Sequence, residues 1–234
     1  MVPLLPVTER VLIAAGVIVI GAILAGLFVR RRAASCWSFV AYLAAVALSD
    51  LLILLWPERF FRQGFWILKE SVHNLLKLAV GLELMVRIFR PFPSAYATAR
   101  RGVIVVVAGL AALVWFSLSG GTDYVAVVGR LHPLVYDGTV WLLVALGAYC
   151  LWYHLPLDSL HKAILIGLVP YLLVYSVMLR ALVALGWERG GVFNRTAPLA
   201  YFALLVYWAY VAWRSGPGLD SGTRVGRLVS GRRS

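Results

Sequence analysis

The sequence has few cysteines and few acidic residues, and it lacks the motifs of common catalytic centres. Cys36 and Cys150 are its two cysteines, too few for the disulfide framework of a small secreted protein. The HExxH pattern of metalloproteases, the GxSxG nucleophile elbow and the GxxxxGK(S/T) phosphate loop do not occur. An enzymatic function therefore has no positive support, and no metal site is expected.

A chromophore or haem is not expected either. Retinal needs a Schiff-base lysine, and the last apolar run of the sequence contains no lysine. A haem needs axial ligands at matched depth on neighbouring spans. His73 falls towards one side of the predicted bundle, and His154 and His161 fall towards the other. The sequence therefore predicts a chain without a cofactor.

The composition is that of a membrane protein. Hydrophobic residues make up 62% of the chain and the mean hydropathy is +0.87, whereas soluble domains are nearer half apolar. The formal net charge is +12, which in a soluble chain would suggest a nucleic-acid partner. In a membrane chain the positions of the basic residues set the orientation instead, so no nucleic acid is expected. The nine tryptophans and eleven tyrosines suit membrane interfaces.

Seven apolar runs are long enough to cross a bilayer once their flanks are included. They cover Val11–Val29, Trp37–Trp56, Phe65–Phe89, Val103–Leu118, Thr139–His154, Leu160–Leu185 and Ala197–Trp213. The sequence thus predicts an all-α integral membrane protein with one seven-helix domain over residues 1–213 and a basic, Gly/Ser/Arg-rich cytoplasmic tail over 214–234. Residues 90–101 and 119–136 are expected to be loops. The nearly uncharged fourth run is expected to be a lipid-facing or structural helix.

The distribution of basic residues sets the orientation. With the N-terminus outside, the cytoplasmic segments carry about twice as many basic residues as the outer ones. The sequence therefore predicts an outer N-terminus and a cytoplasmic C-terminus in a bacterial-type plasma membrane. Cytoplasmic arginines would contact anionic lipid headgroups or an acidic partner. Both cysteines fall towards the cytoplasmic side, where thiols stay reduced, so no disulfide is expected.

The third run is unusual because it carries charges at membrane depth. Lys69, Glu70, His73 and Lys77 fall within an arc of roughly 100° on a helix. Such charges are costly in a bilayer and are found facing protein or a wet cavity. Asp50 on the second run lies at a similar depth, so an ion pair from Asp50 to Lys69 or Lys77 is expected. The candidate ligand-binding or ion-path residues are Asp50, Lys69, Glu70, His73, Lys77, Glu83 and Arg180.

Three interpretations of this cluster are open. The charges could have a purely structural role and fix how the second, third and sixth runs pack. The basic and acidic residues within the runs balance, as such pairing requires. They could line an outward-facing pocket for a small polar or anionic ligand. They could also form a proton or ion path through Glu70, His73, Lys77 and Glu83.

The favoured function is a non-enzymatic sensor, receptor-like module or accessory subunit, which would signal through a separate membrane or cytoplasmic partner. The alternative is a small proton- or ion-coupled transporter that uses the same charged helix. Transporters of this kind usually contain structural repeats, and none is convincing between the first and last three runs. The concentration of polar residues in one helix also argues mildly against a symmetric carrier.

Overall fold

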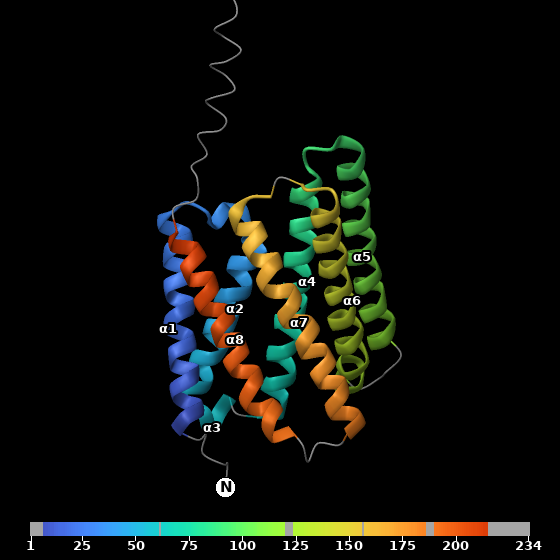
Figure 1. Cartoon of the computed structure of the whole chain (residues 1–234). Helices are drawn as coiled ribbons and strands as arrows, with labels where there is room; N and C mark the ends of the chain where they lie inside the picture. Colours follow the sequence, from blue (N-terminus) through green and yellow to red (C-terminus); the bar gives the residue numbers. More distant parts are fainter. Residues whose placement is uncertain (1–6, 61, 120–123, 156, 186–189, 215–234) are drawn as a thin grey trace, which may run out of the picture.

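The computed structural model describes residues 7–60, 62–119, 124–155, 157–185 and 190–214, and this part of the chain is helical without β-strands. The long helices are α1 (Val7–Val29), α2 (Trp37–Leu55), α4 (Gln63–Phe89), α5 (Pro93–Ser119), α6 (Tyr124–Trp152), α7 (Ser159–Leu185) and α8 (Gly190–Trp213) (Figure 1). Two short elements, the 3₁₀ helix η1 (Ala33–Ser35) and α3 (Pro57–Phe60), connect them.

Six of these helices, α1, α2, α5, α6, α7 and α8, contain segments long and apolar enough to cross a membrane. The chain is therefore a helical, multi-pass membrane protein. Helix α4 is 27 residues long but differs from the other six because it carries five charged side chains.

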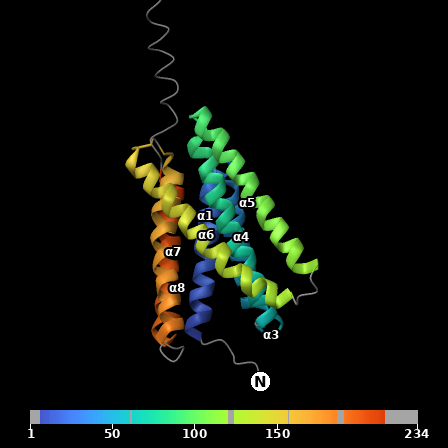
Figure 2. The same ribbon diagram turned by 90° about the vertical axis from the view of Figure 1, so that its right-hand side faces the viewer.

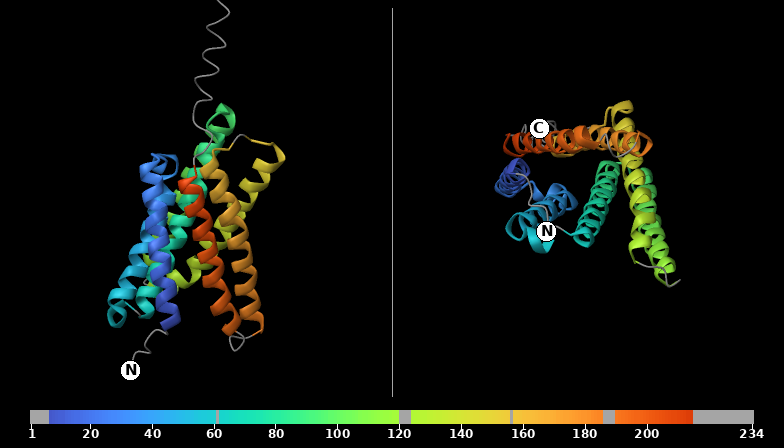
Figure 3. Two further views of the ribbon diagram at one scale, coloured as in Figure 1. Left: turned by 60° about the vertical axis from the view of Figure 1, so that its left-hand side comes forward. Right: turned by 90° about the horizontal axis from the view of Figure 1, so that it is seen from below.

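Successive long helices run up and down the bundle (Figure 1). We call the end that contains Val7, Leu55 and Gln63 the lower end, and the end that contains Val29 and Phe89 the upper end. Seen from below, α4 lies between α2 and α6, and α1 lies beside α8 (Figure 3). Figure 2 shows that α6 is strongly inclined to α7 and α8. The charged helix thus packs against α2, α5 and α6, and its apolar face with Leu68, Val72 and Leu75 is exposed.

The upper half of the bundle is closed by tightly packed apolar side chains. Trp208 is 2% exposed, meets Phe39 edge to face at 4.9 Å between ring centroids, and donates its indole N–H to the carbonyl of Ala163 at 3.2 Å. At Gly167 on α7, a Cβ atom would lie 2.5 Å from Cδ1 of Leu204 and 2.9 Å from Nε1 of Trp208. The close approach of α7 and α8 therefore requires glycine at this position.

Helix α5 lies at the edge of the bundle, as the sequence predicts for the fourth run. Only 6% of its apolar window is buried, against 22–39% in the other candidate spans. It packs on α4 and α6 through a small cluster that includes Leu78, Leu82 and Val135. The edge position agrees with the expectation of a lipid-facing or structural helix, which stays a prediction.

Both expected loops are wrong. Helix α5 begins at Pro93 and covers most of residues 90–101. Helix α6 begins at Tyr124, 15 residues before the predicted start of the fifth span at Thr139. Pro91 and Pro93 in the first stretch, and Gly120, Gly121 and Pro133 in the second, favour turns locally, but tertiary context overrides such preferences. Residues 120–123 and most of the predicted tail, 215–234, lie outside the described residues.

Candidate functional site

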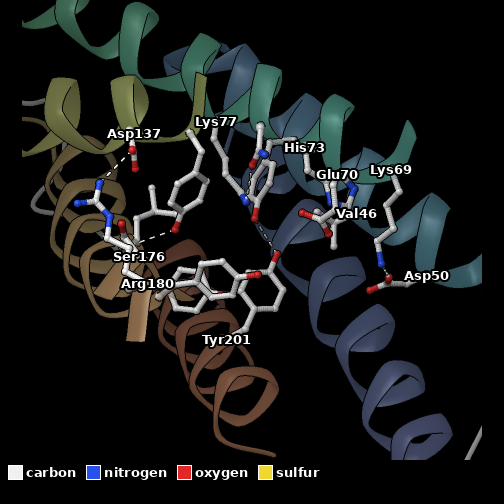
Figure 4. A pocket seen from close by; sticks show the side chains of 16 residues that line it. Val46, Asp50, Lys69, Glu70, His73, Lys77, Asp137, Ser176, Arg180 and Tyr201 are labelled. Atoms are coloured by element: carbon white, nitrogen blue, oxygen red, sulfur yellow. Dashed lines mark hydrogen bonds and ion pairs between the residues drawn. The ribbon is translucent and has the colours of Figure 1, made fainter. Parts of the chain in front are cut away.

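A cavity of about 500 Å³ lies inside the bundle (Figure 4), and its lining residues are mostly in the lower and middle parts of their helices. This volume is within the range of small-molecule sites. The lining residues come from α2, α4, α6, α7 and α8, whereas the sequence predicts a pocket between the second, third and sixth spans, which correspond to α2, α4 and α7. The residues that line the cavity are Tyr42, Val46, Asp50, Lys69, Glu70, His73, Asn74, Lys77, Tyr136, Asp137, Tyr171, Leu172, Tyr175, Ser176, Arg180 and Tyr201.

The first charged feature of the cavity is an ion pair between α2 and α4. Lys69 Nζ lies 2.9 Å from Asp50 Oδ1, and the two side chains are 10% and 19% exposed. The ammonium also lies over the ring of Trp66, 4.6 Å from its centroid. The sequence predicts Lys69 or Lys77 as the partner of Asp50, and the structure pairs Asp50 with Lys69. It depends on the matched depth of the two residues in antiparallel helices.

A second ion pair joins α6 to α7. Arg180 donates to Asp137 at 3.0 Å, and the side chains are 68% and 41% exposed. Sequence reasoning missed Asp137 because it placed this residue in the flank before the fifth span. The early start of α6 brings Asp137 to the wall of the cavity. Arg180, a predicted site residue, therefore has an acidic partner that was not considered.

Glu83 is a predicted site residue that lies outside the cavity. Its carboxylate accepts the backbone N–H of Ser38 at 2.7 Å and of Trp37 at 3.2 Å, and it pairs with Arg87. These N–H groups belong to the first turn of α2, where no carbonyl within the helix can accept them and the helix dipole favours a negative charge. Glu83 therefore caps α2 from a neighbouring helix.

The position of Glu83 interrupts the proposed path of titratable groups. Glu83 lies six residues above Lys77, which is about 9 Å along α4. Val80 and Leu84, on the same helix, are fully buried in the apolar core. The structure thus brings Glu70, His73 and Lys77 together in the cavity and leaves Glu83 apart from them.

Lys77 and Glu70 are the two charged cavity residues outside the ion pairs. The Lys77 ammonium donates to Asn74 Oδ1 at 3.2 Å and lies 5.9 Å from the ring centroid of Tyr136. Within the described part of the chain, neither Lys77 nor Glu70 belongs to an ion pair. Both side chains extend from α4 towards the side of the cavity that holds Tyr201 (Figure 4).

His73 forms part of the cavity wall and is 6% exposed. Its Nε2 lies 3.3 Å from the hydroxyl oxygen of Ser49, and that hydroxyl donates to the carbonyl of Val46 at 2.9 Å. With its own proton used in this way, Ser49 accepts the N–H of His73. The ring also meets Tyr42 edge to face. His73 is therefore held in place by α2.

Five tyrosines, Tyr42, Tyr136, Tyr171, Tyr175 and Tyr201, line much of the rest of the cavity, and we call them the tyrosine wall. Neighbouring rings in the series Tyr136, Tyr175, Tyr171 and Tyr201 have centroids 5.8, 6.1 and 5.5 Å apart. The hydroxyls of Tyr42 and Tyr201 are 3.1 Å apart, and Tyr136 donates to the carbonyl of Leu172 at 3.1 Å.

Sequence reasoning assigned the tyrosines to membrane interfaces and so missed this wall. The four-residue spacing of Tyr171 and Tyr175 places both on one helix face, which is the one local signal that pointed to it. The other three come from different helices, and their convergence depends on the packing of α2, α6 and α8.

Comparisons with known proteins do not identify the site. No protein-family model matches the chain, and no match is found among curated proteins or solved structures. The function must therefore be inferred from the geometry of the cavity.

Replacing Glu83 with glutamine is expected to lower thermal stability in detergent by about 1–2 kcal/mol. Glutamine keeps one acceptor oxygen for the first turn of α2 but loses the charge that pairs with Arg87. The matched control is Glu9→Gln, an exposed acid in the first turn of α1. Equal melting temperatures for the two variants would contradict the capping role.

The two cavity ion pairs are expected to differ in strength. Replacing Asp50 with asparagine or Lys69 with methionine should cost about 2–4 kcal/mol, and the double variant should recover part of that loss, because a mostly buried charge would otherwise be left alone. The same cycle on the more exposed Asp137 and Arg180 should give a coupling of less than about 1 kcal/mol. Unfolding in mixed micelles measures both cycles, and equal couplings would refute the difference.

Proposed function

We propose that this chain is a non-enzymatic, seven-span membrane protein of the sensor or receptor type, or a ligand-binding accessory subunit. In this proposal the lower-end cavity binds a small polar ligand. The observation that carries it is the cavity itself: charged groups and tyrosines line a pocket of about 500 Å³, and packed apolar side chains close the bundle above it.

We propose α4 as the seventh span. Lys69, Glu70 and Lys77 face the cavity, and Glu83 and Arg87 pair with each other. Because of these charges α4 is not a purely apolar helix. The charges are directed to protein or to the cavity, which is where intramembrane charges are tolerated. An odd number of spans also agrees with the positions of Val7 and Trp213 at opposite ends of the bundle (Figure 1).

The proposed orientation places the lower end outside and the upper end in the cytoplasm of a bacterial-type plasma membrane. The arginines that follow α1 and those between α4 and the first turns of α5 lie at the upper end, as the positive-inside rule favours. Anionic headgroups and a signalling partner would then contact this end. The cavity would receive its ligand from outside the cell.

Labelling of single cysteines with a membrane-impermeant maleimide tests the orientation and the crossing of α4 together. Glu58 on α3 and Ser94 at the start of α5 are both exposed, and they precede and follow α4 in the chain. In a background with Cys36 and Cys150 replaced by alanine, Glu58→Cys should react on intact bacterial cells. Ser94→Cys should react only after lysis. Labelling of both on intact cells would exclude α4 as a span, and the reverse pattern would overturn the orientation.

Two observations favour binding over transport. Glu83, the innermost group of the alternative ion path, caps α2 and is separated from Lys77 by buried apolar side chains. Beyond the tyrosine wall, Phe39 and Trp208 fill the bundle interior. A transporter would have to open this packed region during each cycle.

Lys77→Met tests the function directly. The test panel consists of small polar compounds: amino acids, amines, carboxylic acids, sugars and phosphate. At least one of them should raise the melting temperature of the wild-type protein but not that of Lys77→Met. Lys77 supplies a cavity charge, whereas the control, Lys162→Met, changes an exposed lysine outside the cavity.

Proteoliposomes carrying a pH-sensitive dye provide the opposing readout. Under an imposed proton gradient, proteoliposomes with the wild-type protein should leak protons no faster than protein-free vesicles. A proton flux that is lost in Lys77→Met or Glu70→Gln would support the transporter instead. Stabilisation by none of the compounds would overturn ligand binding.

A further inference from the structure

We propose that the ligand of the cavity is a small zwitterion, a molecule of zero net charge that carries both an ammonium group and a carboxylate. In this arrangement Lys77 and Asn74 receive the carboxylate, and Glu70 with the tyrosine wall receives the ammonium. The inference rests on the proposed function, because it specifies the chemical class bound at the same cavity.

The first argument is the charge balance of the cavity. Its lining contains three permanently basic and three acidic side chains: Lys69, Lys77, Arg180, Asp50, Glu70 and Asp137. Four of these side chains form two ion pairs, Lys69 with Asp50 and Arg180 with Asp137. Lys77 and Glu70 are the charges of opposite sign outside these pairs. A ligand of zero net charge leaves this balance intact.

The second argument is the geometry of Lys77 and Glu70. They are seven residues apart, so they lie on the same face of α4 and about 10 Å apart along its axis. Helical side chains lean towards the N-terminus, which directs the Lys77 ammonium towards Glu70 and into contact with Asn74. The two charged groups nevertheless do not form an ion pair. A small molecule with a charge at each end can bridge them.

The third argument is the aromatic surface beside these charges. The rings of Tyr171, Tyr175 and Tyr201 form a continuous series on α7 and α8, and Figure 4 shows Tyr201 on the wall that Glu70 and Lys77 face. Aromatic faces attract alkylated ammonium groups, and several rings together form the cages that bind quaternary ammonium. Glu70 adds the full negative charge that such cages often include.

Singly charged ligands fit the cavity less well. An anion would neutralise Lys77 but leave Glu70 uncompensated, and a cation would do the opposite. Desolvating either group without a partner is costly. The site is therefore expected to discriminate against molecules that lack one of the two charges.

Two matched sets of probes test this inference on the purified full-length protein. Glycine betaine is compared with choline, which lacks the carboxylate, and with 3,3-dimethylbutyrate, which replaces the trimethylammonium with a neutral group of the same shape. γ-Aminobutyrate is compared with butylamine and butyrate. At least one zwitterion should bind about tenfold or more tightly than both of its analogues, measured by thermal shift and calorimetry.

Substitutions supply a second, independent signature. Glu70→Gln should weaken binding of the zwitterion while leaving binding of the carboxylate analogue unchanged. Lys77→Met should weaken binding of the zwitterion and leave the ammonium analogue unchanged. Lys162→Met should change none of the affinities, and unchanged melting temperatures without ligand would show that the variants are folded.

The outcomes separate this inference from the proposed function. If neither zwitterion binds more tightly than both of its singly charged analogues, the zwitterion proposal is overturned and a ligand-binding cavity remains. Stabilisation by a sugar or phosphate but by none of the six probes would do the same. Stabilisation by no compound in either panel would overturn both proposals.

Discussion

Charged side chains inside a helical bundle need a partner or a polar cavity, and the arrangement of the bundle around α4 provides one or the other. Helix α4 carries more charges than any other long helix of the described chain. Its position between α2 and α6 gives each charge a different environment. Lys69 pairs with α2, Glu83 accepts two N–H groups of α2, and Lys77 and Glu70 face the cavity. An edge position like that of α5 would expose these groups to lipid.

The two halves of the bundle have different roles because their side chains differ. In the upper half, Trp208, Phe39 and the glycine at position 167 allow α7 and α8 to pack closely through apolar side chains. In the lower half, charged groups and tyrosines occupy the inward faces of the same helices, and their polar ends keep a cavity open. Close apolar packing therefore lies above the cavity, and polar side chains surround it.

The sequence predicted the helical membrane fold and the charged face of α4 because both depend on local patterns. The matched depth of Asp50 and Lys69 also follows from counting residues along antiparallel helices. Asp137 and the tyrosine wall were missed for a different reason. Their roles depend on where α6 begins and on which faces of α6, α7 and α8 turn inwards, and these are properties of tertiary packing. Glu83 was assigned to the cavity because helical periodicity places it near Lys77 without showing what lies beside it.

The contacts of α4 differ from residue to residue, and they bear on the three interpretations in different ways. Lys69, Glu83 and Arg87 have partners within the fold, so helix packing accounts for them. Glu70 and Lys77 face the cavity and belong to no ion pair within the described residues. If packing alone had placed charges on this helix, these two would also have paired, because an uncompensated charge in a bundle interior costs stability. Their separation of about 10 Å along α4, beside the tyrosine wall, is therefore the observation that supports the proposed ligand.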